Sequence, residues 1–285
     1  MSKLKIAIQK SGRLSEKSLA LLQESGISIS NGTRKLKTEA RNFPLEVLFL
    51  RDDDIPQYVE DGVADIGIVG ENEVLEKNCN TLTAMRLGFS RCRLCLAVPK
   101  EADYTGLEWF NGKRVATSYG HILKGFFEKN NIDAGIETIS GSVEIAPGIG
   151  LADGIFDIVS TGSTLVMNGL KEVETVMKSE ALLISNEKLS PEKETLLEQL
   201  CFRFEAVNRA KEHKYILLNA PNSSIEAIAS ILPGMKSPTV LPLAEEGWSS
   251  LHSVVPEDKF WNVIDQLKEL GAQGILVSSI EKLVL

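Results

Sequence analysis

A group of acidic and hydroxyl side chains surrounds a glycine between residues 153 and 165. Asp153 and Asp157 stand four residues apart, Asp157 lies in an apolar run typical of a strand, and Ser160–Thr164 follows directly. Gly162 permits unusual backbone torsions, and free N–H groups at a helix start form an anion site. Because a ribose phosphate needs donors for its phosphate and acceptors for its hydroxyls, the segment is predicted to bind one. The residues assigned to this phosphoribosyl site are Asp153, Asp157, Ser160, Thr161, Gly162, Ser163, Thr164 and Leu165.

Two plainer interpretations of this segment stay open. Serine and threonine also favour an ordinary N-capped turn. Asp157 could pair structurally, since an unpaired carboxylate in an apolar run is costly. No Walker-type G-x-x-x-x-G-K-[ST] pattern occurs in the chain, so the segment is not a P-loop.

Basic side chains at the ends of strands in the first part of the chain are candidates for binding other phosphates. Lys10, Arg13 and Arg51 each lie at or next to such an end. The alternative for each is a solvated surface charge, and for Arg91 and Arg93 the sequence does not decide. The acidic run at residues 52–54 is more typical of a helix N-terminus than of a metal site.

Short apolar runs alternate with helical patterns through residue 170, which indicates an α/β architecture with mainly parallel strands. The pattern D-G-x-x-D-I-x-x-x-G occurs at residues 61–70 and again at 153–162. This echo predicts two related lobes with a ligand cleft at the carboxyl ends of their strands. It also sets Glu71 and Asn72 in positions equivalent to Ser163 and Thr164. Helices are expected at 15–24, 55–61, 121–130 and 144–152.

The pattern changes after Gly169. Residues 174–185 indicate one or two strands, and residues 191–207 indicate a long amphipathic helix. A β-α-β-β-α-β order then follows, which is typical of a small ferredoxin-like α+β domain. We place the boundary near residue 211.

The composition excludes some classes of protein. The chain has 285 residues, 43% hydrophobic and 25% charged, with a formal net charge of −8. Such a charge disfavours wrapping nucleic acid or lying on an anionic membrane. No leader-like or membrane-spanning apolar run is evident, so a cytoplasmic location is expected. Cys92 and Cys95 lie three apart on an expected strand, so we expect reduced structural cysteines rather than a zinc or redox pair.

The segment Glu144–Leu165 resembles, without a gap, a characteristic stretch of the ATP phosphoribosyltransferase family. Residues 9–14, 51–56, 65–72 and 112–119 also resemble stretches of that family, and the part from about 211 resembles the extra domain of its long form. The resemblance implies two periplasmic-binding-protein-like α/β lobes around a cleft plus a C-terminal ferredoxin-like α+β domain. The expected limits are 1–95 with 175–210 for lobe I, 96–174 for lobe II and 211–285 for the regulatory domain.

The resemblance implies a reaction and its cofactor. N1 of ATP attacks C1 of 5-phosphoribosyl 1-diphosphate, giving 1-(5-phospho-β-D-ribosyl)-ATP and diphosphate, with Mg²⁺ accompanying the diphosphate. This is the first step of histidine biosynthesis, and its cation-like transition state needs positioning and charge neutralisation more than proton transfer. The implied catalytic residues are Lys10, Arg13, Glu144 and Asp157. The implied nucleotide-binding residues are Gln9, Lys10, Gly12, Arg13, Arg51, Glu71, Asn72, Thr117, Ser118 and Tyr119.

The C-terminal resemblance implies feedback inhibition by histidine. The implied histidine-binding residues, at interfaces between such domains, are Asn219, Met235, Ser237, Thr239, Val254 and Gly274. The family often has Asp where this chain has Asn219, which leaves the strength of histidine binding open. Inhibition requires an oligomer that changes arrangement, and the resemblance implies homo-oligomers, dimers and hexamers.

The main alternative is a non-catalytic two-lobed protein that binds and senses a metabolite. Such a protein would not need the paired aspartates before a Thr-Gly loop. The absence of a helix-turn-helix pattern with a basic helix also weighs against a transcriptional regulator. The three histidines are expected to be structural.

Overall fold

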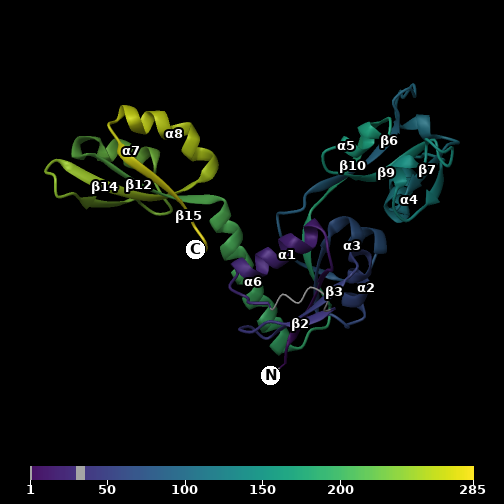
Figure 1. Cartoon of the computed structure of the whole chain (residues 1–285), viewed down its shortest axis with the longest axis horizontal. Coiled ribbons are helices and arrows are strands. Elements are labelled where there is room, and N and C mark those ends of the chain that lie inside the picture. The colour runs from purple at the N-terminus through teal and green to yellow at the C-terminus, as the bar shows by residue number, and fades with distance from the viewer. Residues whose placement is uncertain (1, 30–35) are drawn as a thin grey trace. The chain divides into compact units, whose positions relative to one another are not determined.

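The computed structural model describes residues 2–29 and 36–285, which form two compact units, 1–201 and 202–285 (Figure 1). The first unit contains two sheets and the second contains one.

The first sheet has six strands in the order β2-β3-β1-β4-β11-β5. Their bounds are Leu4–Gln9 (β1), Lys37–Glu39 (β2), Leu45–Leu50 (β3), Ile66–Gly70 (β4), Leu82–Arg86 (β5) and Ala181–Ser185 (β11). β1 runs parallel to both β3 and β4, so the carboxyl ends of these three central strands meet at one edge. The helices of this lobe are α1 (Arg13–Glu24), a 3-10 turn at Asp52–Asp54, α2 (Ile55–Glu60) and α3 (Glu71–Lys77).

The second sheet has five strands in the order β10-β6-β9-β7-β8. Their bounds are Cys92–Pro99 (β6), Arg114–Thr117 (β7), Gly135–Thr138 (β8), Gly154–Val159 (β9) and Leu170–Ser179 (β10). β7 runs parallel to β8 and β9, whereas β6 is antiparallel to β9 and β10. The helices of this lobe are α4 (Gly120–Lys129) and α5 (Ser163–Met167), with 3-10 turns at Leu107–Phe110 and Val143–Ile145.

Alternation along β6 explains why both faces of the second sheet are covered. Leu94 and Leu96 pack into a core that includes Phe127 of α4, whereas Cys95 and Ala97 pack into a core that includes Leu165 of α5. Successive strand residues point to opposite faces, so the continuous apolar run buries both sides. The sheet therefore holds α4 and α5 as fixed supports for the loops that precede them.

The chain passes between the sheets at residues 87–91 and at Glu180. The limits expected at 95 and 174 fall inside β6 and β10, which both belong wholly to the second sheet. The apolar pattern of β6 and β10 does not indicate to which of the two sheets these strands belong.

The prediction of a helix at residues 144–152 is wrong. Only a 3-10 turn at Val143–Ile145 forms, followed by turns up to residue 151. Pro147 lacks a backbone donor, and Gly150 adopts φ +74, outside the helical region. Ala146 and Ala152 are nevertheless buried, so the segment packs against the sheet with only isolated helix-type hydrogen bonds, such as that from the Ile149 N–H to the Ile145 carbonyl at 3.3 Å.

A long helix, α6 (Pro191–Lys211), spans the division between the two units. The second unit then has the order β12 (His213–Pro221), α7 (Ile225–Ile231), β13 (Thr239–Pro242), β14 (Trp248–Pro256), α8 (Glu257–Glu269) and β15 (Gln273–Ser279). Its antiparallel sheet has the order β13-β14-β12-β15, the split β-α-β arrangement of a ferredoxin-like domain. The fold class is therefore two α/β lobes plus a C-terminal ferredoxin-like α+β domain.

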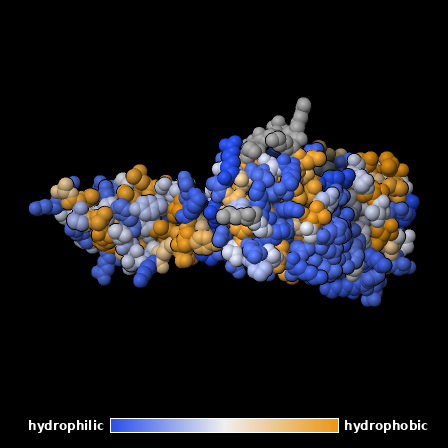
Figure 2. Space-filling view, turned by 90° about the horizontal axis from the view of Figure 1, so that it is seen from below, coloured by the Kyte–Doolittle hydropathy of each residue, from blue (hydrophilic) through white to orange (hydrophobic). Residues whose placement is uncertain are grey.

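The visible face of the molecule is mixed in character. Figure 2 shows hydrophilic and hydrophobic side chains interspersed over that face. Among the described residues, no helix has both the length and the apolar composition needed to cross a bilayer. All four cysteines are free.

Candidate functional site

A cavity of about 460 Å³ lies between the two lobes of the first unit. Lobe I supplies most of its wall, the crossing between the sheets supplies Ser90 and Arg91, and lobe II supplies Cys92, Tyr119, Ile158 and Ser160. The lobe I residues are Gln9, Gly12, Arg13, Leu14, Lys17, Asp52, Gly70, Asn72 and Glu73. Arg13, Lys17 and Arg91 give it three cations, so it suits a ligand with several negative charges.

The turn after β1 carries two of these cations. Gly12 precedes α1 with φ +99, a conformation that a side chain would strain. α1 then starts at Arg13 and carries Lys17 one turn later on the same face. The amide of Gln9 donates to the carboxylate of Asp52 at 3.0 Å, which joins the ends of β1 and β3.

Two expected cations do not line this cavity. Lys10 is absent from its wall, and its backbone N–H donates to the carbonyl of Leu50. Arg51 is exposed and pairs with Asp53 at 3.1 Å. Both lie beside the cavity at the carboxyl edge of the first sheet, on flexible side chains.

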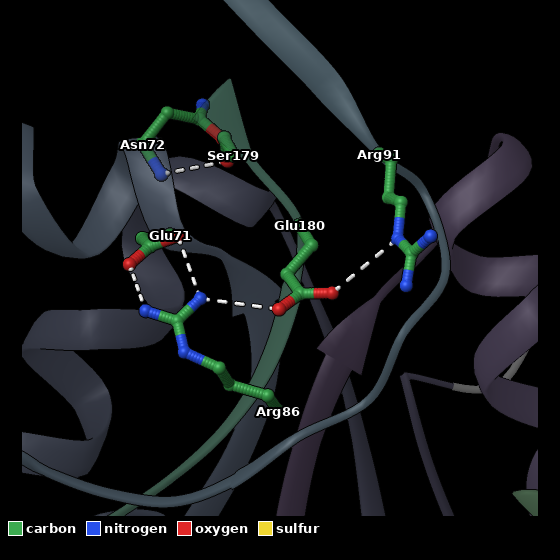
Figure 3. A network of polar contacts seen from close by, with 6 residues as sticks. All are labelled: Glu71, Asn72, Arg86, Arg91, Ser179 and Glu180. Carbon is green, nitrogen blue, oxygen red and sulfur yellow. Dashed lines mark hydrogen bonds and ion pairs between the residues drawn. The ribbon is translucent and has the colours of Figure 1, made fainter. Parts of the chain in front are cut away.

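Glu71 takes part in a network at the crossing between the lobes rather than in the cavity wall (Figure 3). Its carboxylate accepts two hydrogen bonds from Arg86, at 2.5 and 3.0 Å, and Arg86 also pairs with Glu180 at 3.1 Å. Arg91 lies 3.7 Å from Glu180 and lines the cavity as well. The network thus connects the site to the strand that leaves lobe II.

Asn72 does line the cavity, and it is buried. Its backbone N–H donates to Ser179 Oγ at 3.1 Å, and Ser179 Oγ donates to its amide oxygen at 2.8 Å. The amide nitrogen then faces Glu73 at 2.9 Å and Tyr119 Oη at 3.3 Å. Every polar atom of the Asn72 amide therefore has a partner.

Thr117 and Ser118 shape the turn before α4 instead of facing the cavity. Thr117 is fully buried, and its hydroxyl accepts the backbone N–H of Tyr119 at 2.8 Å. The Ser118 hydroxyl donates to the carbonyl of Ile139 at 2.8 Å. These bonds shape the turn that presents Tyr119 to the cavity.

The Thr161–Leu165 segment leads from β9 into the short helix α5. Gly162 has φ +81 and precedes the short helix α5, and the hydroxyls of Thr161 and Ser163 lie 3.0 Å apart. Ser160 lines the cavity, whereas residues 161–165 are not part of its wall. The Arg93 guanidinium donates to the Ser160 carbonyl at 3.2 Å and to Glu172 at 2.6 and 2.9 Å, which fixes the base of the loop.

Asp157 lies in β9, just before the loop. Burial raises the pKa of its carboxyl to about 6, the nearby charge of Glu144 adds to this, and a hydrogen bond from the Ile158 N–H opposes it. No cation pairs with it among the described contacts. A carboxylate kept without a cationic partner is suited to accept hydrogen bonds from sugar hydroxyls.

Asp153 is not brought to the loop. It precedes β9, whereas the loop follows β9, and a six-residue strand at about 3.3 Å per residue separates them by roughly 20 Å. Its carboxylate accepts the Arg114 N–H at 2.9 Å, and its own N–H donates to the Arg114 carbonyl at 2.8 Å. Asp65 and Lys5 make the same pair of bonds in lobe I. Asp153 thus has a structural role at the start of the strand. The repeated sequence pattern aligns Asp65 with Asp157, whereas the structure pairs Asp65 with Asp153, four residues earlier.

The cavity is also lined by residues that were not expected from the sequence, among them Lys17, Glu73 and Cys92. A signal existed for Lys17, because it stands four residues after Arg13 on a helical face. Glu73 and Cys92 gave none, because they lie on elements whose pattern indicates only burial.

The residues expected to bind histidine do not line one cavity within the second unit. Met235 and Val254 line a cavity of about 470 Å³ between α7 and α8, and Gly274 lines another of about 600 Å³. Asn219 lies beside Gly274, its amide nitrogen 3.6 Å from where a Cβ on Gly274 would stand. Among the described residues, no group of three His, Cys, Asp or Glu side chains is placed to hold a metal.

The chain matches the family model for ATP phosphoribosyltransferase over residues 51–206, and that for the HisG C-terminal domain over residues 210–282. It is 60% identical to the ATP phosphoribosyltransferase of Phocaeicola vulgatus, covering 99% of this chain and 100% of that protein. It is likewise 60% identical to that of Bacteroides thetaiotaomicron, covering 99% of both. The chain belongs to the ATP phosphoribosyltransferase family.

Solved structures agree with this assignment. The ATP phosphoribosyltransferase (HisG:HisZ) complex of Thermotoga maritima contains a chain with 30% identity and a TM-score of 0.61, covering 71% of this chain and 98% of that one. Tv2483 bound to L-arginine has 11% identity and a TM-score of 0.51, covering 73% and 86%, and shows a likeness of fold alone.

Membership of the ATP phosphoribosyltransferase family establishes the class of activity. The chain is a glycosyltransferase of this type, which joins ATP to 5-phosphoribosyl 1-diphosphate in the first step of histidine biosynthesis. The non-catalytic sensor alternative is not supported. Members of the family use a divalent metal ion.

Proposed function

We propose that the cavity between the lobes is where N1 of ATP attacks C1 of 5-phosphoribosyl 1-diphosphate. One observation carries the proposal: Arg13 and Lys17 of lobe I and Arg91 of the crossing share a cavity with Tyr119 and Ser160 of lobe II. ATP would bind on the lobe I side, with Arg13 and Asn72, and the phosphoribosyl donor would bind at the Ser160–Leu165 loop.

The chemistry asked of these residues is positioning and neutralisation. Arg13, Lys17 and Arg91 would offset the charge of the triphosphate and of the departing diphosphate. Asp157 would accept hydrogen bonds from the ribose hydroxyls, and the backbone amides at Ser163 would face the 5-phosphate. Glu144 would act on the phosphoribosyl side, where its negative charge lies near Asp157 and helps to raise the pKa of that carboxyl. We keep Lys10 and Arg51 as candidates at the cavity rim, and we leave Asp153 out.

The metal would be Mg²⁺, bound with the diphosphate. Mg²⁺ is commonly held by substrate phosphates together with one or two carboxylates, and Asp52 offers a hard oxygen ligand in the cavity wall. When bound, the ion would stabilise negative charge on the leaving diphosphate.

The C-terminal unit would be the regulatory domain, with histidine bound near Asn219, Met235 and Gly274 at contacts between copies. The domain limits that follow from the sheets are 2–86 with 181–201 for lobe I and 92–179 for lobe II. The relatives' long form supports assembly into dimers and hexamers, which coupling between distinct sites would require.

The site assignment is tested by steady-state kinetics, following the rise in near-ultraviolet absorbance as N1-substituted adenine forms with pyrophosphatase present. Thr161→Ala combined with Asp157→Asn should raise the KM for the phosphoribosyl donor about a hundredfold and that for ATP far less. Arg13→Ala should raise the KM for ATP, whereas Lys124→Ala, an exposed cation on α4, should change neither. Equal effects on both substrates would show that the two halves are misassigned.

A further inference from the structure

Glu73 is a buried carboxyl that the proposed reaction does not use. It stands in the first turn of α3, only 9% exposed, and lines the cavity between the lobes. A buried carboxyl with no cationic partner is costly, so its retention here calls for a physical reason.

One oxygen of Glu73 joins the two lobes. Its Oε1 accepts the Tyr119 hydroxyl of lobe II at 3.0 Å and the Asn72 amide of lobe I at 2.9 Å. Asn72 is in turn fixed by Ser179, the last residue of β10, where the chain leaves lobe II. Tyr119 is held from behind by the Thr117 hydroxyl.

A second contact supports the same alignment. The carboxylate of Glu76, one turn further along α3, accepts the backbone N–H groups of His121 and Ile122 at 2.9 and 3.0 Å. These are free donors at the start of α4, so α3 caps the helix of the other lobe. Glu76 does not line the cavity, which separates its role from that of Glu73.

We propose that Glu73 is a positioning residue that holds Tyr119 and Asn72 together across the cavity and so aligns the two substrate-binding lobes. The proposal rests on the assignment of this cavity as the reaction site. Glu73 touches neither reacting atom in this scheme. It acts through the two polar side chains that it fixes, which are the nucleotide-side residues contributed by different lobes.

The carboxyl also makes this alignment sensitive to pH. Burial raises the pKa of Glu73 to about 7, and the hydrogen bond from Tyr119 opposes the rise. The other ionisable groups that face this cluster are Asp52, Asp53, Lys77, Cys92 and, beside Tyr119, Asp157. Because burial outweighs the hydrogen bond from Tyr119, the aligned arrangement favours the neutral carboxyl, so the alignment weakens as pH rises through about 7.

Three variants test the proposal by steady-state kinetics from pH 6 to 8, with folding checked by circular dichroism. Glu73→Ala should raise KM for both substrates about tenfold at pH 6, where the wild-type carboxyl is neutral, and change kcat less. Glu73→Gln keeps an Oε1 that can accept both bonds, so it should restore most of the lost affinity but abolish the pH step near 7. Tyr119→Phe in the Glu73→Ala background should add little, because the two share one interaction.

The outcomes separate this proposal from the site assignment. Wild-type KM values in Glu73→Ala, or a pH step that persists in Glu73→Gln, would overturn the positioning role while the loop variants still affect the phosphoribosyl donor. If the loop variants leave the donor's KM unchanged, the site assignment itself has failed. Glu128→Gln, an exposed carboxyl on α4, is the matched control and should behave as wild type.

Discussion

Two buried carboxyls, one in each lobe, dominate the site at the scale of single residues. Asp157 and Glu73 both have a raised pKa, near 6 and 7, and burial is the main cause for each. Both therefore change charge within the range in which enzymes are assayed. Their consequences differ, because Asp157 is proposed to accept from substrate while Glu73 accepts from the protein.

For Asp157 the consequence is a pH-dependent affinity. We expect kcat/KM for the phosphoribosyl donor to fall as pH drops below about 6, because a protonated carboxyl accepts hydrogen bonds poorly. Asp157→Asn should lower kcat/KM at neutral pH and remove this limb of the profile. If the limb survives in the variant, it belongs to the substrate phosphates instead.

For Glu73 the consequence is a dependence of stability on pH. Its pKa is raised from 4.5 to about 7 in the folded chain, so the favourable contribution of its neutral form is lost as pH rises between these values. Relative to Glu73→Gln, the wild-type free energy of unfolding should fall by up to about 3 kcal/mol from pH 4.5 to 7. Urea denaturation at several pH values measures this, and parallel curves for the two proteins would contradict it.

At the scale of elements, strands and helices with a strong apolar pattern could be predicted from the sequence, and the others could not. The buried strands β1, β3 and β4 coincide with apolar runs, whereas β5 is almost wholly exposed at the sheet edge and shows no alternation. The segment 144–152 has the apolar residues of a helix, but proline and glycine override that pattern. The local pattern of apolar residues predicts which side chains are buried, but it does not predict the backbone conformation of the segment.

The same limit applies to the site. Motif and resemblance singled out Tyr119, Arg13 and Ser160, which all line the cavity. The pairing of Glu71 with Arg86 and of Asp153 with Arg114 could not, because each depends on strands brought together from distant parts of the chain.

The cap that α3 places on α4 gives a prediction at this scale. Glu76→Ala removes the acceptor for two free N–H groups, so it should lower the free energy of unfolding by about 1 kcal/mol. Glu128→Ala, on the exposed face of α4, should have little effect. Thermal denaturation of the two variants makes the comparison, and equal loss in both would mean that the contact contributes nothing.

At the scale of the whole molecule, the two compact units imply separable tasks. A chain ending at Lys211 keeps α6 and loses the ferredoxin-like domain. We expect it to lose inhibition by histidine, measured as residual activity against histidine concentration. Its oligomeric state, by light scattering, must be determined alongside, because a change of assembly can alter activity by itself. Inhibition that persists would move the histidine site out of residues 211–285.

The crossing between the lobes has a consequence for the origin of the protein. The Leu87 N–H donates to the Ala181 carbonyl at 2.9 Å, and the Ala181 N–H donates to the Phe89 carbonyl at 3.0 Å, so the chain leaves and re-enters the first sheet at one point. The second lobe is therefore a continuous insertion into the first. Its first strand, β6, and its last strand, β10, pair with each other. A gene could have acquired or exchanged that lobe as a single cassette, with a short turn joining Leu87 to Ala181 in its absence.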